Sequence, residues 1–427
     1  MPTAKAIDYF QLLRRPYDEL VDMYRRRGPV VKTGLGPIRF TFLLGAEANQ
    51  FVFANSDLFR WREAMEFLVP ITGESALIVS DGAPHKRRRR LMQPAFHHRQ
   101  IAEYVDTFRR NADQVIDGWR PGTVVDAYAE FRRAIRRSTI ELLFGDRLAA
   151  DEQRLGDQLQ LVLDLLDLLP FERLVQERFG LPTWRRSLAA KAEVDGLVYE
   201  EITYRRAHPE QAGKDVLSAL VEAVDEDGDR LSDEEIRDQV ISLIAAGYET
   251  TSAAMGWLVH ELVNAPEHWQ RAAGAPYDDP AVANLVSEGL RLHPPAVMSG
   301  RYVATEFEFA GEQIPVGSQL VISPYVTHRL AEIWPEPKRF DPERWNPDRP
   351  GYHKPTPAEF LPFAAGPHRC IGATFATVEL QVILSRLLER VTLSPVPQRI
   401  RPIGYGAMRP RYGVQVRVEE VRQGQDV

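Results

Sequence analysis

The chain of 427 residues contains one cysteine, Cys370, in the segment FLPFAAGPHRCIGATFATVEL. Phe363 and Gly366 precede it, Gly372 follows it, and the residues after Gly372 are typical of a helix. A thiol beside a helix N-terminus is favoured as the thiolate by the helix dipole and by free backbone N–H groups. The glycines let the backbone turn tightly and let a large flat ligand approach. A lone cysteine is usually a small buried hydrophobe, but this setting favours a ligand.

The segment IAAGYETTS (244–252) places an acid, Glu249, next to a hydroxyl, Thr250, within a helical pattern. Gly247 in a helix interior costs about 1 kcal/mol relative to alanine. The Thr250 hydroxyl can bond to an upstream carbonyl and open the helix. Close packing of small residues against a neighbouring helix explains the same pattern equally well.

Two charged patterns have simple explanations as well as functional ones. Glu288 and Arg291 in SEGLRLHPP lie at i, i+3, which fits a surface ion pair worth about 0.2–0.5 kcal/mol. The run HKRRRRL (85–91) fits a solvated helix face or a nucleic-acid patch. In a helix over 84–92, His85 and Arg89 share one face at i, i+4, whereas Arg88 and Arg90 point elsewhere.

Composition narrows the class of protein. The formal charge is -7 and 44% of the residues are hydrophobic, which argues for a large core and against a dedicated nucleic-acid binder. One cysteine excludes intramolecular disulfides and thiolate-rich zinc or iron–sulfur sites. The N-terminus shows no signal peptide, and no apolar run approaches about 18 residues. We therefore expect a soluble, cytoplasmic protein without a membrane anchor or nucleic-acid partner.

The elements that must position these residues are mostly helices. Helical patterns dominate from about 98 to 293 and include 101–119, a buried helix over 159–171, and a helix of about 30 residues that begins with a Ser232–Glu235 capping box. Strand patterns occupy 30–44, with turns at Gly34 and Gly36-Pro37, and 307–322. An ordered meander covers 334–367, and a last helix covers 373–391. We predict one mainly α domain with a minor β portion over 1–427, with 1–15 loosely ordered.

FAAGPHRCIG resembles the haem-binding loop of the cytochrome P450 monooxygenases. Phe363, Gly366, Cys370 and Gly372 match its fixed positions, and His368 stands where the family has arginine or histidine. The resemblance extends over roughly residues 16–420. It implies the P450 fold, with a long central helix over a buried haem b whose iron is bound by Cys370. The implied activity is oxidation of a hydrophobic small molecule such as a fatty acid, terpenoid or steroid.

The resemblance also implies roles for the charged patterns. Glu288 and Arg291 match the family's Glu-x-x-Arg helix, and Arg344 in FDPERW matches the arginine that completes a triad behind the haem loop. Glu249 and Thr250 match the oxygen-activating acid and threonine. The haem propionates would be held by four residues: His85, Arg89, Arg301 and His368.

Electrons are expected from separate proteins, because no flavin or nicotinamide domain fits in this length. We expect a ferredoxin with its NAD(P)H-dependent reductase, docked on a basic face formed by Lys86, Arg88 and Arg90. By family position, the substrate pocket draws on seven apolar residues: Phe67, Leu68, Ala245, Ala246, Val297, Met298 and Met408. A peroxygenase, a desaturating, epoxidising or coupling oxidase, and a haem protein without turnover remain as alternatives.

Overall fold

The computed structural model describes residues 15, 17–35, 38–166, 168, 170–404 and 406–423, and these are mainly helical with a minor strand portion, as predicted. They divide into two units, each made of two stretches of chain. Unit 1 is Met1–Phe67 with Ser287–Cys370, and unit 2 is Leu68–Val286 with Ile371–Val427. That the two form the single domain expected from the sequence stays a prediction, and segment 1–14 lies outside the described residues.

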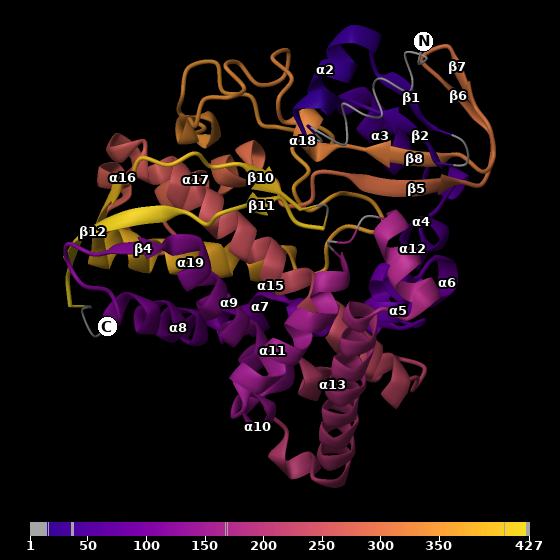
Figure 1. Cartoon of the computed structure of the whole chain (residues 1–427), viewed down its shortest axis with the longest axis horizontal. Helices are drawn as coiled ribbons and strands as arrows, with labels where there is room; N and C mark the ends of the chain where they lie inside the picture. The colour runs from indigo at the N-terminus through magenta and orange to yellow at the C-terminus, as the bar shows by residue number, and fades with distance from the viewer. Residues whose placement is uncertain are drawn as a thin grey trace. The chain divides into compact units, whose positions relative to one another are not determined.

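Unit 1 contains a five-stranded sheet, which is visible in Figure 1. Its strand order is β1 (Val30–Leu35), β2 (Ile38–Leu43), β8 (Gln319–Ile322), β5 (Ser299–Val303) and β3 (Phe59–Arg60). Strands β2 and β8 run parallel, and the other neighbours are antiparallel. The predicted strand pair over 30–44 is confirmed. The turn predicted at Gly34 is wrong, because Gly34 pairs with Arg39 within β1 and β2.

A hairpin and several short helices complete unit 1. Strands β6 (Phe307–Phe309) and β7 (Glu312–Ile314) are joined by Ala310 and Gly311, which both have positive φ, at 51° and 78°. Two such residues in succession make the mirror-image turn whose twist suits a two-residue hairpin. The helical segments of the unit are α2 (Asp18–Arg27), α3 (Ala46–Ala54), η1 (Ser56–Leu58), α4 (Arg62–Met65), α18 (Pro324–Thr327) and η7 (Pro342–Trp345).

The core of unit 1 joins the sheet to α3 and the hairpin. It contains aliphatic residues from the strands and from α3, and Phe307 of the hairpin contacts the rings of Phe51 on α3 and Phe59 on β3. Segment 334–367 has no regular structure except η7, which confirms the predicted meander. Helix α17 (Pro280–Leu292) runs from unit 2 into unit 1 and carries Glu288 and Arg291 in its last turns.

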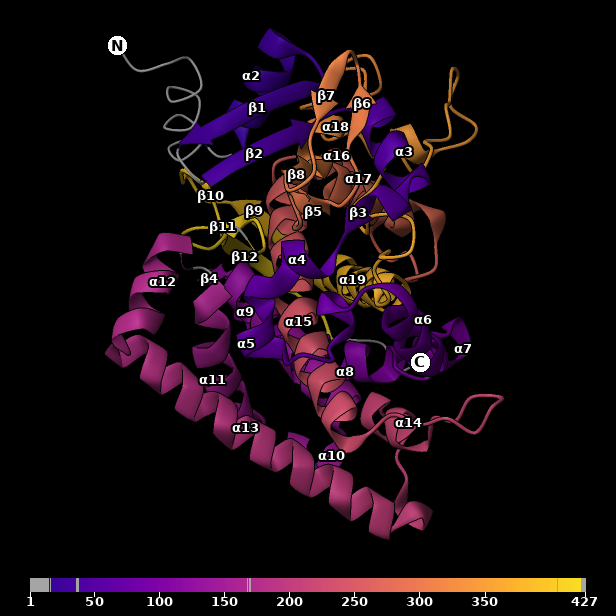
Figure 2. The same ribbon diagram turned by 90° about the vertical axis from the view of Figure 1, so that its right-hand side faces the viewer.

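Unit 2 holds most of the helices. In chain order its helical segments are α5 (Val69–Thr72), η3 (Leu77–Val79), α6 (Gly82–Met92), η4 (Gln93–Phe96), α7 (His98–Ala102), α8 (Val105–Asp117), α9 (Ala127–Phe144), α10 (Asp146–Ala149), α11 (Glu152–Leu163), η5 (Asp164–Leu166), α12 (Pro170–Phe179), α13 (Pro182–Ala207), η6 (Pro209–Gln211), α14 (Val216–Glu222), α15 (Asp233–Val263), α16 (Pro266–Ala272) and α19 (Ala373–Arg390), while η2 (Glu66–Leu68) lies at the junction with unit 1. Its strands are β4 (Val124–Asp126), β12 (Gln415–Val421) and β9 (Val391–Pro395) in one sheet and β10 (Pro402–Ile403) with β11 (Arg409–Pro410) in another. Figure 2 shows α13 beside α11.

Helix α15 spans 31 residues and begins with the predicted capping box. The Ser232 hydroxyl accepts from the Glu235 amide, and the Glu235 carboxylate accepts from the Ser232 amide, both at 3.1 Å. Helix α9 packs closely against α15 because the ring of Tyr128 lies where a side chain of residue 256 would be. A Cβ at Gly256 would be 2.8 Å from Tyr128 Cδ2, so only glycine allows this approach.

Two predicted helices are wrong in their extent. The pattern over 101–119 is divided between α7 and α8 at Glu103-Tyr104, where the buried Tyr104 donates to the carbonyl of Lys214 and packs on Phe375. The stretch 159–171 is divided among α11, η5 and α12, and residues 167 and 169 lie outside the described ones. In both cases tertiary contacts and chain turns interrupt an apolar periodicity that continues in the sequence.

None of the helices that the structure describes is both long enough and apolar enough to cross a lipid bilayer.

Glu379 on α19 is a buried acid with no role in the patterns above. It is 1% exposed, and its Oε1 has no hydrogen-bond partner among the described residues. Burial raises the pKa of this carboxyl well above its usual value. The folded chain therefore keeps a proton that the unfolded chain releases.

We expect Glu379→Gln to gain stability relative to the wild type as the pH rises. A raised folded-state pKa gives stability that is present below the unfolded pKa and is lost as pH increases, by up to about 1.4 kcal/mol per pH unit. Urea unfolding from about pH 5 to about pH 8 measures the difference. Exposed Glu226→Gln is the control, and parallel curves for the wild type and Glu379→Gln would contradict the assignment.

Candidate functional site

Cys370 lies at the end of a tight loop and three residues before α19 begins at Ala373. The Cys370 amide donates to the carbonyl of Phe363 at 2.9 Å, and Gly366 has a φ of 73°. The cysteine is exposed, which excludes the buried-hydrophobe explanation. At Gly372, the N-cap of α19, an added Cβ would meet nothing within 4 Å. The loop thus presents its thiol at a helix N-terminus, the setting that favours a thiolate.

The single thiol of Cys370 suits a metal ion that is already bound by a cofactor and needs only one ligand from the protein. Among the residues that the structure describes, no group of three or more His, Cys, Asp or Glu side chains could hold a metal ion. Haem iron is already bound by the four nitrogens of its porphyrin, so a single protein thiolate would be enough to hold it. The side chains present therefore fit haem and do not form a bare metal site.

Two of the predicted propionate ligands, Arg301 and His368, share one aromatic partner in unit 1. The Arg301 guanidinium carbon lies 4.4 Å from the ring centroid of Trp61, and the His368 ring stacks on Trp61 at 4.4 Å and 6°. The Arg301 side chain also donates to the Ser299 hydroxyl and the Gly300 carbonyl. Sequence reasoning missed this role of Trp61, because the stack joins three segments that are far apart in the chain.

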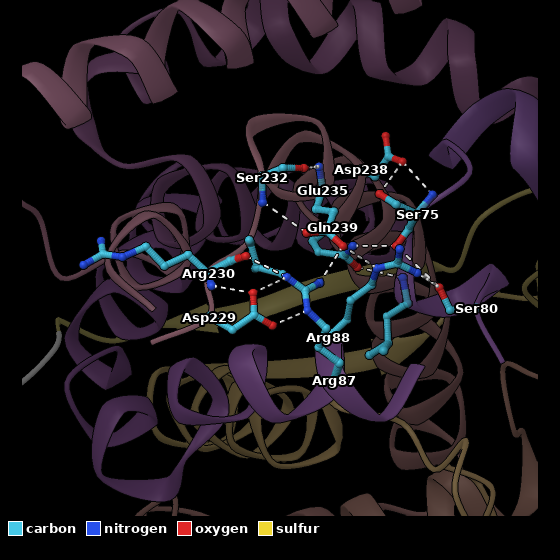
Figure 3. Close-up of polar contacts among 12 residues, drawn as sticks. Ser75, Ser80, Arg87, Arg88, Asp229, Arg230, Ser232, Glu235, Asp238 and Gln239 are labelled. Atoms are coloured by element: carbon cyan, nitrogen blue, oxygen red, sulfur yellow. Dashed lines mark hydrogen bonds and ion pairs between the residues drawn. The ribbon is translucent and has the colours of Figure 1, made fainter. Parts of the chain in front are cut away.

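The basic run forms most of α6 in unit 2, as predicted, and His85 is buried. Arg89 is half-buried on the same helix. Arg87, which the sequence leaves unassigned, donates to Asp229 and to Glu235 (2.7 Å). Figure 3 shows Arg87 and Arg88 directed toward the start of α15.

The prediction that Arg88 faces solvent is wrong. Its side chain is only 17% exposed, and it donates to Glu235 Oε1 and to the Ser80 hydroxyl, both at 2.9 Å. Arg90 is exposed as predicted but pairs with Asp225. The reason is tertiary: the acidic segment before α15 lies against α6 and neutralises arginines that a helical wheel assigns to solvent. Lys86 is exposed.

Glu249 is held by neighbours in unit 2. Its Oε2 accepts from Arg132 Nε at 2.8 Å, its Oε1 accepts from the Tyr128 hydroxyl at 2.9 Å, and Arg409 Nε lies 3.6 Å from Oε1. Arg132 also donates to Gln160 on α11 and to the Tyr248 hydroxyl. Burial and the charge of Glu249 raise the pKa of Tyr128, so this phenol stays a donor.

The Thr250 side chain bonds back to its own helix, and α15 continues through it without a break. Its hydroxyl lies 2.7 Å from the Ala246 carbonyl and 3.1 Å from the Gly247 carbonyl, as the sequence allows. Ala246 is exposed although most of α15 is buried, and a Cβ at Gly247 would meet nothing within 4 Å. The middle of α15 therefore presents small residues and a hydroxyl to open space.

Glu288, Arg291 and Arg344 lie together in unit 1, and the first two are fully buried. Arg291 forms a bidentate pair with Glu288 at 2.8 Å, and Arg344 Nε lies 3.3 Å from Glu288 Oε1. The Asp341 amide and the Trp345 indole also donate to Glu288, which the sequence did not indicate. The surface-pair explanation is therefore wrong, and the carboxylate holds the meander.

His328 extends the same network. Leu361 donates its amide to His328 Nε2, and His328 Nδ1 lies 3.1 Å from the carbonyl oxygen of Arg291. Burial, with the charges of Arg291 and Arg329, lowers the pKa of His328 well below its usual value. A neutral ring satisfies both bonds only with its proton on Nδ1, so His328 links α17 to the segment before the cysteine loop.

The predicted pocket residues differ in exposure and in unit. In unit 2, Leu68 and Met408 are buried, Ala245 is half-buried, and the Met408 carbonyl accepts from the Trp257 indole at 2.9 Å. In unit 1, Phe67 is exposed, Val297 is buried and Met298 is half-buried.

Helix α5 and the leucine-rich segment 159–166 meet within unit 2. Residues of α5, α11, η5 and α13 form one apolar cluster: Ile71, Val162, Leu165, Trp184 and Ala190. Leu168 packs against it. The cluster gives α5 an apolar support although α5 has only four residues.

We expect Arg291→Met to reduce the free energy of unfolding by about 3–5 kcal/mol, because it leaves the buried Glu288 carboxylate without its main partner. Arg339→Met is the control: Arg339 pairs with Glu336 at 3.2 Å with both side chains exposed, and its loss costs less than about 1 kcal/mol. Urea unfolding measures both values. Equal costs would show that the Glu288 network does not stabilise unit 1.

Comparison with known proteins assigns the chain to a family. The family model described as Cytochrome P450 matches residues 7–273 and 280–417. A relative from Mycobacterium tuberculosis strain H37Rv, "Putative cytochrome P450 139", is 46% identical over 96% of this chain and 99% of its own length. The cyclooctat-9-en-7-ol 5-monooxygenase of Streptomyces melanosporofaciens is 32% identical over 90% of this chain and 87% of its own.

A third relative, the pentalenene oxygenase of Streptomyces avermitilis, is 30% identical over 92% of this chain and 90% of its own. Among solved structures, retinoic acid-bound cyanobacterial CYP120A1 matches with a TM-score of 0.85 and 24% identity over 96% of both chains, which supports the fold. The thiol loop, the Glu288 network and the match along nearly the whole chain lead to one conclusion: the protein belongs to the cytochrome P450 family.

Proposed function

We propose that this protein binds haem through the thiolate of Cys370 and inserts one atom of dioxygen into an apolar small molecule, with electrons from a separate donor. The observation that carries the proposal is the exposed thiol on its tight loop immediately before α19. When bound, haem supplies the activation of dioxygen and the oxidation of the substrate. The protein supplies the ligand, the orientation of the substrate and the handling of protons.

Four residues would hold the haem propionates: His85, Arg89, Arg301 and His368. Arginine and histidine donors suit carboxylates because charge-assisted hydrogen bonds are stronger than neutral ones. His85 and Arg301 are both buried, and in a region shielded from water a hydrogen bond from an arginine or histidine to a carboxylate is stronger than in solvent. Trp61 keeps Arg301 and His368 in fixed positions by stacking between them.

Thr250 and Glu249 would deliver protons. The Thr250 hydroxyl donates a hydrogen bond to the Ala246 carbonyl. Because a hydroxyl can rotate, it can donate to another acceptor instead. Glu249 is bonded to Arg132 and Tyr128, so it has to give up at least one of these bonds before it can receive or pass a proton. Arg132 and Tyr128 therefore control when the carboxylate acts.

The substrate we propose is a cyclic terpenoid. Two relatives at least 30% identical act, by their names, on cyclooctat-9-en-7-ol and on pentalenene. The apolar cluster around Ile71 and the small residues Ala245 and Ala246 suit a bulky apolar molecule better than a charged one. A cyclic terpenoid should shift the spin state of the haem iron, whereas a straight-chain fatty acid should not; the opposite result would exclude this class.

The electron donor we propose is a ferredoxin that is reduced by an NAD(P)H-dependent reductase. The exposed Lys86 on α6 would attract an acidic donor, whereas Arg90, although exposed, is paired with Asp225 and would add less. Because Arg87 and Arg88 are neutralised within unit 2, they contribute little to this attraction. The basic surface on α6 is therefore smaller than its sequence indicates.

The reduced, carbon monoxide-bound protein is expected to show the long-wavelength Soret band that marks thiolate ligation. In Cys370→His this band should move to the shorter wavelength of an imidazole ligand, because the axial donor changes from sulfur to nitrogen. Absorption spectra of both proteins at equal haem content make the comparison. A long-wavelength band that survives in Cys370→His would remove Cys370 from the proposal.

With a substrate that shifts the spin state, Thr250→Ala should lower the product formed per NAD(P)H consumed by about tenfold, the effect of one lost hydrogen bond of about 1.4 kcal/mol. Thr251→Ala is the matched control: its hydroxyl also donates to the Gly247 carbonyl at 2.9 Å, but it is buried and should leave coupling unchanged. Product analysis and cofactor oxidation give the ratio. Equal coupling in both variants would contradict the role of Thr250.

A further inference from the structure

The first two turns of α15 carry a polar face that no part of the proposed reaction uses. Glu235, Asp238 and Gln239 lie at i, i+3 and i+4 and so project from one side of the helix. Asp238 and Gln239 are fully buried. Figure 3 shows these residues directed toward Ser75, Ser80 and the arginines of α6. We call these three residues the polar face of α15.

Asp238 binds the backbone of the segment that follows α5. Its Oδ2 accepts from the Ser75 amide at 2.8 Å and from the Ser75 hydroxyl at 2.7 Å, and Arg237 Nη1 lies 3.0 Å from its Oδ1. Gly73, with a φ of 91°, lies directly against the carboxylate, and an added Cβ would overlap it. Only glycine permits this approach, so the chain turns at the point where Asp238 holds it.

Gln239 holds the next part of the same segment. Its Oε1 accepts from the Leu77 amide at 2.7 Å, and its Nε2 donates to the Ser75 carbonyl at 2.8 Å. The side chain thus pairs with two backbone groups as a neighbouring strand would. Together, Asp238 and Gln239 satisfy backbone groups that residues 73–77 cannot satisfy within their own short structure.

Glu235 binds a different element. Its Oε1 accepts from Arg87 Nη1 at 2.7 Å and from Arg88 Nε at 2.9 Å, and both arginines belong to α6. The polar face therefore fixes two segments separately. Asp238 and Gln239 hold segment 73–77, whereas Glu235 holds the helix that carries His85 and Arg89.

Burying polar side chains costs free energy that the burial of apolar side chains does not cost. Buried polar side chains therefore act mainly by selecting one arrangement of the chain. Segment 73–77 directly follows α5, whose Ile71 belongs to the apolar cluster with α11 and α13. We propose that Asp238 and Gln239 are specificity-determining positioning residues: they fix the backbone of 73–77, next to α5, and thereby the positions of Leu68 and Leu77, which would line the substrate site. The inference rests on the function proposed above.

Two iron-ligating azoles of different size test the proposal, because imidazole itself needs little space whereas 1-tritylimidazole presses against the substrate-binding segments. We expect Gln239→Met to bind imidazole like the wild type, within about twofold, and to bind 1-tritylimidazole about tenfold more weakly, since two backbone hydrogen bonds to 73–77 are lost. Optical titration of the haem spectrum measures both dissociation constants. Gln239→Glu keeps the acceptor for the Leu77 amide and should recover part of the affinity.

The controls separate the possible failures. Glu234→Gln, an exposed first-turn residue of α15, should bind both azoles normally. Glu235→Ala should release haem to apomyoglobin several-fold faster, because Arg87 and Arg88 of α6 lose the carboxylate that they share, whereas Gln239→Met should not. If wild-type protein gives no nitrogen-ligand spectrum with imidazole, the proposed function fails. If Gln239→Met and Gln239→Glu bind both azoles like the wild type, or lose both equally, the positioning role is wrong.

Discussion

Polar side chains along α15 are matched by partners on several neighbouring segments of unit 2. Near its start, Asp238 and Gln239 bind backbone groups of 73–77; in its middle, Glu249 binds Arg132 of α9. Toward its end, Gly256 accommodates the ring of Tyr128. A buried polar group without a partner costs several kcal/mol, so these contacts have to form together. The arrangement of unit 2 around α15 is therefore fixed by polar matching as well as by apolar packing.

In unit 1, one buried carboxylate and its arginine partner provide hydrogen bonds to backbone groups that lack regular secondary structure. The meander has almost no secondary structure, so its backbone groups need partners from elsewhere. Glu288 and Arg291 provide them: Glu288 accepts from the Asp341 amide, while Arg291 donates to the carbonyls of His328 and Pro337. His328 passes the network to Leu361, nine residues before the cysteine. The loop that presents Cys370 thus follows a segment anchored by buried charges.

The basic run on α6 shows which features of a helix its periodicity can predict and which it cannot. Period alone separates His85 and Arg89 from Arg88, and the burial of His85 agrees with that division. It assigns Arg88 to solvent, because a helical wheel contains only one helix. The acidic residues that neutralise Arg87 and Arg88 lie more than 140 residues later in the chain, at Asp229 and Glu235. Charge on a helix face therefore predicts a partner without saying whether it is solvent, a cofactor or the protein itself.

Local sequence determined the elements and the chemistry of short motifs. The capping box predicted the start of α15, the glycines around Cys370 predicted the loop before α19, and Glu288 with Arg291 predicted an i, i+3 pair, because all of these depend on residues a few positions apart. Only the tertiary structure decided that this pair is buried, that Trp61 stacks between Arg301 and His368, and that Gln239 holds segment 73–77. The physical reason is that the contribution of a polar side chain to stability depends on its burial and on its partner. Both are set by segments that meet only in the folded chain.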